Sequence, residues 1–199
     1  MEIHYDVIVV GAGHAGSEAA HAAAQLGSSV LLITMNMETI AKMSCNPAMG
    51  GVAKGQIVRE IDALGGMSGI ISDRSAIQFR MLNRSKGAAM WSPRTQNDRQ
   101  LFSLYWRETL EQNPNVSFFQ DMVKEVIVEG EKIKGVKTGM GFCFYAPSVV
   151  LTSGTFMNGL IHIGRNNFGG GRMAERASTG ITQQLEQFGF ESGRMKTGT

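Results

Sequence analysis

A glycine-rich run near the start of the sequence places the strongest constraint on the fold. Residues 11–16 read Gly-Ala-Gly-His-Ala-Gly, which is the GxGxxG pattern. The run follows an apolar segment at 5–10 and precedes an alanine-rich segment at 17–26, after which Gly27 occupies the place of a helix C-cap glycine. A second apolar segment follows at 29–34. This order predicts a strand–helix–strand unit of the Rossmann type.

Each glycine of the pattern has a physical role in binding a dinucleotide. Gly11 allows the tight turn out of the strand, Gly13 lets the backbone approach a pyrophosphate, and Gly16 lets the helix pack closely on the strand. The phosphates then meet the free N–H groups and the positive dipole end of the helix. The residues expected to bind the phosphates are Gly11, Ala12, Gly13, His14, Ala15 and Gly16. For His14 we expect a contact through the backbone only.

The usual acidic residue that binds the ribose is missing at the end of the second strand. Residues 33–36 read Ile-Thr-Met-Asn, and the nearest acid, Glu38, comes slightly late. Thr34 or Asn36 could replace it, or the ribose could be held in another way.

The order of the later segments favours FAD over NAD as the dinucleotide. A segment at 35–115 interrupts the alternation of strands and helices and is interpreted as an insertion, and a β-meander is expected at 123–146. A buried strand at 148–152 then ends in the turn Thr152-Ser153-Gly154, which resembles the second flavin-contact motif of glutathione-reductase-like flavoproteins. The further expected elements are helices at 54–64, 95–112 and 181–188, a strand at 116–120, and a loop at 157–178.

Composition excludes several other classes of protein. No run approaches 18 consecutive apolar residues, so no transmembrane helix is expected, and the first residues lack the basic region of a secretory signal. The two cysteines, Cys45 and Cys143, form no CxxC pair, so we expect no metal site and infer a reducing, cytoplasmic location.

Positive charge is concentrated in the interrupting segment. Residues 54–107 carry a net charge of +5. Such an excess suits a phosphate-rich ligand or a nucleic acid, although a solvated surface is an equal alternative on charge alone. Five of these residues are candidates for nucleic-acid contact, with flavin or subunit contacts as alternatives: Arg80, Arg84, Lys86, Arg94 and Arg99.

Several longer motifs resemble those of one family, from about residue 4 to the last residue. They are Ser44-Cys45-Asn46-Pro47-Ala48-Met49-Gly50-Gly51, residues 60–66, residues 77–87, residues 151–156, Ile161-His162-Ile163-Gly164, Gly170-Gly171-Arg172 and Lys196-Thr197-Gly198-Thr199. Together with the glycine pattern, these resemble the N-terminal third of the MnmG (GidA) family of tRNA uridine 5-carboxymethylaminomethyl modification enzymes.

The resemblance implies an activity and a set of partners. It implies an FAD-binding domain spanning 1–199 within a longer chain, with NADH as reductant bound beyond residue 199. It also implies a homodimer that works with the GTPase MnmE to install a carboxymethylaminomethyl-type group at C5 of the wobble uridine of tRNA, with a folate-derived carbon.

The resemblance also implies site residues beyond the glycine loop. Val123, Gly154 and Ser178 match positions at which the family or its flavoprotein relatives contact FAD, although the residues before Ser178 lack the family's usual proline. Cys45 matches a catalytic candidate. Its chemistry is suitable, because C5 of uracil becomes nucleophilic once a thiolate adds to C6, and Lys54 or backbone amides could stabilise that thiolate. Cys143 lies in an aromatic strand and is interpreted as a core residue.

Three alternatives remain open at this point. A folate- and FAD-dependent tRNA uridine methyltransferase shares the glycine pattern, but an acid should then end the second strand. A flavin-dependent disulfide reductase should show a CxxxxC pair, which this sequence lacks. The third alternative is a non-catalytic FAD-binding module, which would be distinguished from the enzymes by a full-length protein that has no catalytic activity.

Overall fold

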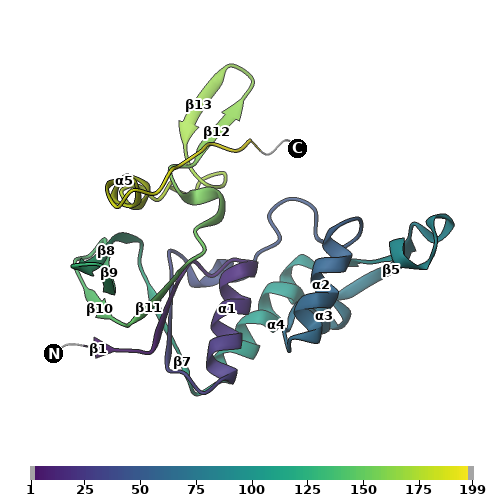
Figure 1. Ribbon diagram of the computed structural model, residues 1–199. Helices are drawn as coiled ribbons and strands as arrows, with labels where there is room; N and C mark the ends of the chain where they lie inside the picture. The colour runs from purple at the N-terminus through teal and green to yellow at the C-terminus, as the bar shows by residue number, and fades with distance from the viewer. Residues whose placement is uncertain (1–2, 197–199) are drawn as a thin grey trace.

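The computed structural model describes residues 3–196, and its centre is a parallel four-stranded sheet (Figure 1). The strands are β2 (Val7–Val10), β3 (Val30–Thr34), β7 (Val116–Gln120) and β11 (Ser148–Leu151), in the order β11-β2-β3-β7. β2 and β3 are almost continuously apolar because both of their faces are covered. This confirms the predicted α/β, Rossmann-like fold.

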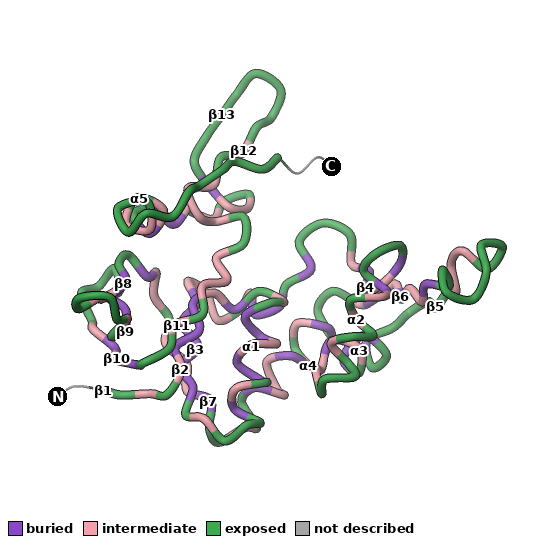
Figure 2. Tube along the Cα trace, in the orientation of Figure 1, coloured by how far each residue is buried: buried purple, intermediate pink, exposed green. Residues whose placement is uncertain are grey.

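The two faces of the sheet carry different layers. Helices α1 (His14–Gln25) and α4 (Arg99–Glu111) cover one face, where their side chains pack with Val9, Val30 and Leu32. The other face packs Ile8, Val10, Leu31 and Ile33 against a second sheet and α5 (Ile181–Gln187). Alternate strand residues therefore enter opposite cores, as the twofold period of a strand requires. Figure 2 shows the burial concentrated in these central strands.

The second sheet contains the predicted meander. Its strands β8 (Val123–Glu129), β9 (Lys132–Thr138) and β10 (Cys143–Tyr145) are antiparallel, and β1 (Ile3–His4) joins β10 in parallel. Cys143, at the start of β10, is half-buried rather than enclosed in the core.

The segment between β3 and β7 is more structured than the sequence indicates. It contains the expected α2 (Lys54–Ala63), an unexpected α3 (Ser68–Arg74), and a sheet of β4 (Ala48–Gly50), β5 (Ala76–Leu82) and β6 (Ser92–Asn97) in the order β4-β6-β5. The helix expected from residue 95 begins only at Arg99. The reason is that residues 92–97 pair with β5, and the Asp98 carboxylate then caps α4 by accepting from the Gln100 and Leu101 amides, both at 2.9 Å.

Two other expected boundaries differ from the structure. The first helix begins at His14 rather than at residue 17, because the glycine loop itself forms its N-terminus. The stretch 157–178, expected to be a loop, contains a hairpin of β12 (Leu160–Ile163) and β13 (Asn166–Gly169). Most of this hairpin is exposed, so it lacks the alternation of apolar and polar residues that marks a half-buried strand. It projects from the body in Figure 1.

No helix within residues 3–196 is both long and apolar enough to span a bilayer.

Candidate functional site

The loops after all four parallel strands meet at one edge of the sheet. Backbone hydrogen bonds join these loops to neighbouring strands: Gly11 N donates to Ile33 O (2.8 Å), Asp121 N to Thr34 O (2.9 Å) and Thr152 N to Val10 O (2.9 Å). Ligands of parallel α/β sheets bind outside the carboxyl ends of the strands. This edge is therefore the place where a dinucleotide would bind.

Two glycines of the loop are required by close packing. Gly11 has a φ of +99°, and a Cβ there would lie 2.6 Å from the Thr152 carbonyl oxygen. A Cβ at Gly16 would lie 2.7 Å from Thr152 Oγ1 and closer still to the Gly11 carbonyl oxygen. Thr152 Oγ1 in turn donates to the carbonyl oxygens of Val10 and Gly11, both at 2.8 Å. Thr152 therefore locks the loop to β11, a role that the sequence analysis did not assign.

Gly13 differs because its missing side chain faces open space. No atom lies within 4 Å of the position of an added Cβ. Gly13 is also the N-cap of α1, with no side-chain cap and no acid in the first turn of that helix. The helix N-terminus is thus accessible and carries uncompensated positive dipole, as an anion site requires. These residues fit a pyrophosphate group.

His14 connects this loop to the segment after β3. Its Nε2 donates to the Ala41 carbonyl oxygen (3.0 Å), and Ala41 N donates to Ala12 O (2.8 Å). Burial lowers the pKa of His14 from its ordinary value of 6.5, and the charges of Lys54 and Arg172 lower it further. The imidazole is therefore neutral at pH 7, and two cationic side chains lie close enough to the glycine loop to affect it.

The residues considered for the ribose are already engaged in the loop after β3. Asn36 Oδ1 accepts from Glu38 N (2.8 Å) and caps the short helix η1 (Met37–Thr39). Glu38 forms an exposed ion pair with Arg107 (3.1 Å). Thr34 is buried, and its hydroxyl is 3.4 Å from the Asn36 carbonyl oxygen. The ribose contact remains a prediction without a favoured residue.

The structure brings the other predicted FAD residues towards the same edge. Val123 is buried at the start of β8, two residues after the Asp121 that bonds to the end of β3. Gly154 is exposed at the start of η4 (Gly154–Phe156), after the Thr152-Ser153 turn that follows β11. Ser178 is buried, and its backbone bonds to Phe156 O (2.8 Å) and Asn158 N (2.7 Å). Their contacts with FAD remain predictions.

Cys45 lies exposed in the loop that leads from Ala41 to β4. Two arginines hold this loop: Arg99 Nη2 donates to the Cys45 carbonyl oxygen (2.8 Å), and Arg172 Nη1 donates to Ser44 Oγ (3.3 Å). The thiol is therefore accessible to a substrate, and the backbone beside it is held by guanidinium groups.

Arg172 is the main site residue that the sequence reasoning missed. Besides Ser44, it pairs with Glu175 (3.4 Å), and its guanidinium lies 5.0 Å from the centre of the Phe156 ring. It thus links the Cys45 loop to the turn after β11. Because Ser44 and Arg172 are 128 residues apart, no local spacing could indicate the contact, although the Gly170-Gly171-Arg172 motif marked the region.

The five basic residues proposed for nucleic-acid contact do not form a single group. Arg80, Arg84 and Lys86 are exposed along β5 and the turn that follows it. Arg94 is half-buried on β6 and donates to Gln96 Oε1 (3.2 Å). Arg99 is bound to the Cys45 loop. The structure therefore places four of the five residues on the β5–β6 hairpin and its tip, and Arg99 apart from them beside the Cys45 loop.

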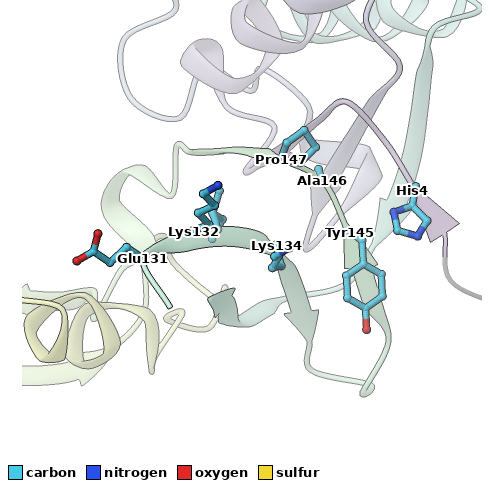
Figure 3. A pocket seen from close by; sticks show the side chains of 8 residues that line it. His4, Glu131, Lys132, Lys134, Tyr145, Ala146 and Pro147 are labelled. Atoms are coloured by element: carbon cyan, nitrogen blue, oxygen red, sulfur yellow. The ribbon is translucent and has the colours of Figure 1, made fainter. Parts of the chain in front are cut away.

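A cavity of about 550 Å³ lies away from the sheet edge, on the meander (Figure 3). Its lining includes His4, Tyr145, Lys132 and Lys134, and the His4 and Tyr145 rings stack with their centres 5.5 Å apart. None of the predicted site residues lines it.

Comparison with known proteins gives matches over nearly the whole chain. Residues 6–199 match the family described as "Glucose inhibited division protein A". The "tRNA uridine 5-carboxymethylaminomethyl modification enzyme MnmG" of Cytophaga hutchinsonii is 70% identical over 195 residues, which are 98% of this chain and 31% of that protein. The protein of the same name from Flavobacterium johnsoniae is 68% identical over the same shares. The chain thus spans about a third of the length of these relatives.

Solved structures support the same assignment. The GidA structure of Aquifex aeolicus superposes with a TM-score of 0.91 at 45% identity and covers 94% of this chain and 31% of that one. A GidA-related protein of Thermus thermophilus has a TM-score of 0.68 at 22% identity, over 94% of this chain and 69% of that one, which supports the fold alone. With its glycine loop, sheet order and motifs in agreement with these matches, the chain belongs to the glucose inhibited division protein A (GidA) family, as its sequence motifs predict.

Proposed function

We propose that this chain forms the FAD-binding part, residues 1–199, of a longer enzyme that modifies C5 of the wobble uridine in tRNA. Relatives with 70% identity that are named as tRNA uridine modification enzymes support the substrate class. The observation that carries the proposal is the glycine loop, which is tightly packed at Gly11 and Gly16 and open only at Gly13. Of these three glycines, only Gly13 leaves open space, and it lies at the N-terminus of α1, where a ligand's phosphates would bind.

The residues of the sheet edge would hold FAD as follows. The backbone of residues 11–16 would bind the pyrophosphate, with Lys54 and Arg172 adding positive charge nearby. Val123 would lie towards the adenine, and Gly154 and Ser178 would contact the remainder of the cofactor. When bound, the flavin supplies two-electron redox chemistry, with NADH as the reductant.

Cys45 would activate the uracil ring. Its thiolate forms a bond from Sγ to C6, and the electrons of the C5–C6 double bond move towards the O4 carbonyl, so that C5 becomes nucleophilic. C5 would then attack the folate-derived methylene carbon in its iminium form, with the C=N π electrons passing to nitrogen. Loss of the C5 proton and departure of the thiolate would restore the C5–C6 double bond, and the amine of the installed group would displace the folate nitrogen from the methylene carbon. The exposure of Cys45, and the two arginines that hold its loop, support this role.

The remaining parts of the proposal concern the whole enzyme. We propose that it is cytoplasmic, acts as a homodimer with the GTPase MnmE, and binds NADH outside residues 1–199. Within this chain, 35–115 is the inserted segment and 123–146 is the meander.

An absorbance spectrum of the full-length protein, with and without NADH, tests the proposal. We expect bands near about 370 and 450 nm that bleach when NADH is added. Nucleoside analysis of tRNA from a Cys45→Ser strain should then show loss of the modified uridine, while the purified variant keeps its flavin. A colourless protein that does not bind added FAD would refute the cofactor assignment, and normal tRNA modification in the variant would refute the role of Cys45.

A further inference from the structure

The β5–β6 hairpin extends away from the rest of the molecule and ends in an ordered tip, residues 83–91 (Figure 1). Two short helices form the tip, η2 (Arg84–Lys86) and η3 (Ala88–Met90). Backbone hydrogen bonds hold it, from Lys86 N to Asn83 O (2.9 Å) and from Met90 N to Gly87 O (3.0 Å). The tip is therefore a hydrogen-bonded turn structure rather than an irregular loop.

The hairpin carries positive charge without any acidic residue. Residues 74–97 contain five arginines or lysines and no aspartate or glutamate. Arg74 lies over the Tyr105 ring at the base of the hairpin, whereas Arg94 on β6 lies directly opposite Arg80 on β5 and donates to Gln96. Arg80 is exposed at the level of Arg94, and Arg84 and Lys86 are exposed further out, in the tip. The outer part of the hairpin therefore presents an electrostatic surface that suits phosphates.

An exposed indole lies among these charges. Trp91 is 38% exposed at the end of the tip, next to Met90, which is 47% exposed. The Trp91 Nε1 donates to the Arg84 carbonyl oxygen (3.2 Å), and the Arg84 guanidinium lies 5.9 Å from the ring centre. The ring is thus oriented before any ligand arrives, which reduces the entropy lost on binding.

From this arrangement we propose that the tip is a binding platform for single-stranded RNA, in which an unpaired base stacks on Trp91 while Arg84 and Lys86 contact the flanking phosphates. Proteins that bind single strands combine aromatic rings for bases with cationic side chains for the backbone. The large apolar side chains exposed in the tip are Met90 and Trp91, and Ile77 and Phe79 are exposed nearer the base of β5. The apolar surface of the tip itself is smaller than a membrane anchor or a subunit interface requires. The inference rests on the proposed function, because that function supplies tRNA as the RNA.

Binding of a labelled tRNA anticodon stem–loop to the full-length protein tests the platform. We expect Trp91→Ala to weaken the Kd about tenfold, and Trp91→Phe, which keeps an aromatic face, to stay within about threefold of the wild type. Arg84→Gln and Lys86→Gln should each lower the slope of log Kd against log salt by about 0.7. Lys132→Gln on the meander changes charge to the same extent and should leave the slope unchanged.

Intrinsic fluorescence gives a second readout at the proposed contact. The RNA should quench a component of the tryptophan emission that is absent from Trp91→Phe, whereas Trp106, which is fully buried, should not respond. Wild-type affinity in both Trp91→Ala and Arg84→Gln would overturn the platform. A loss of dimerisation in these variants would also overturn it. The same holds if the variants bind phosphatidylserine vesicles more weakly while their RNA affinity is unchanged.

The two proposals can fail separately. Flavin content and tRNA nucleoside analysis of the wild-type protein report on the proposed function alone. If the wild type modifies tRNA and the tip variants bind RNA normally, only the platform is wrong. If the wild type neither binds flavin nor modifies tRNA, the proposed function is wrong.

Discussion

Alanine substitutions at Gly13 and Gly16 should separate ligand binding from packing in the glycine loop. A methyl group at Gly16 would lie 2.7 Å from Thr152 Oγ1, 2.9 Å from the Gly11 carbonyl carbon, and closer still to the Gly11 oxygen. Cβ atoms essentially never approach within 3.0 Å, so α1 or the loop must move. At Gly13 the same methyl group meets no atom within 4 Å, and the φ of −74° suits alanine.

The expected loss of stability follows from these contacts. For Gly16→Ala, overpacking costs about 1–3 kcal/mol, and disturbing the Thr152 hydroxyl hydrogen bond costs about 1 kcal/mol. The gain in helix propensity returns up to about 1 kcal/mol. We therefore expect a net loss of about 1–4 kcal/mol. Gly13→Ala changes only the N-cap and should cost less than about 1 kcal/mol.

Binding of FAD should respond differently from stability. Both variants should lose affinity, by about tenfold or more for Gly13→Ala, because the methyl group occupies the side from which the phosphates approach. The measurements are urea denaturation midpoints of the flavin-free full-length proteins and titration with FAD. Gly169→Ala, another glycine with open space, is the matched control and should change neither quantity. A wild-type midpoint for Gly16→Ala, or wild-type FAD affinity for Gly13→Ala, would refute this reasoning.

Three further predictions concern individual side chains. The pKa of His14 is lowered in the folded state, so its contribution to stability is complete above about pH 6.5 and is lost as the pH falls towards that lower pKa. In denaturation measured across this pH range, His14→Gln should therefore show a smaller loss of stability with falling pH than the wild type. Arg172→Lys should reduce kcat about tenfold with flavin content unchanged, because a lysine ammonium cannot contact Ser44 and Glu175 at once as the planar guanidinium does. An unaltered rate in single-turnover assays would show that this bridge does not affect the reaction. Asp98→Ala should lower the stability of α4 by about 1 kcal/mol, and Asp98→Asn should recover most of it in urea unfolding.

The central sheet and the glycine loop could be predicted because their signals are local. The strands β2 and β3 are runs of apolar residues, since layers cover both of their faces, and the glycine spacing reflects contacts within a few residues of the turn. The meander was predictable for a similar reason, because glycines mark the turns between its strands.

The wrong element boundaries lie where hydrogen bonding to another strand outweighs the local sequence pattern. Residues 95–97 continue the helical pattern of α4, but their hydrogen bonds to β5 and the cap at Asp98 place them in a strand. The sequence did not predict the β12–β13 hairpin, because its strands are mostly exposed and therefore need no alternation of apolar and polar residues. A pattern of apolar residues reports burial, and it says little about strands that bury no complete face.

The sequence by itself therefore determined the fold class, the family and the phosphate-binding loop, all of which depend on residue types at short spacing. Only the tertiary structure decided that Thr152 locks the glycine loop, that Arg172 holds the loop of Cys45 from 128 residues away, and that Trp91 stands among cations at the end of a hairpin. The physical reason is that such contacts depend on the path of the whole chain, and short-range periodicity carries no information about that path.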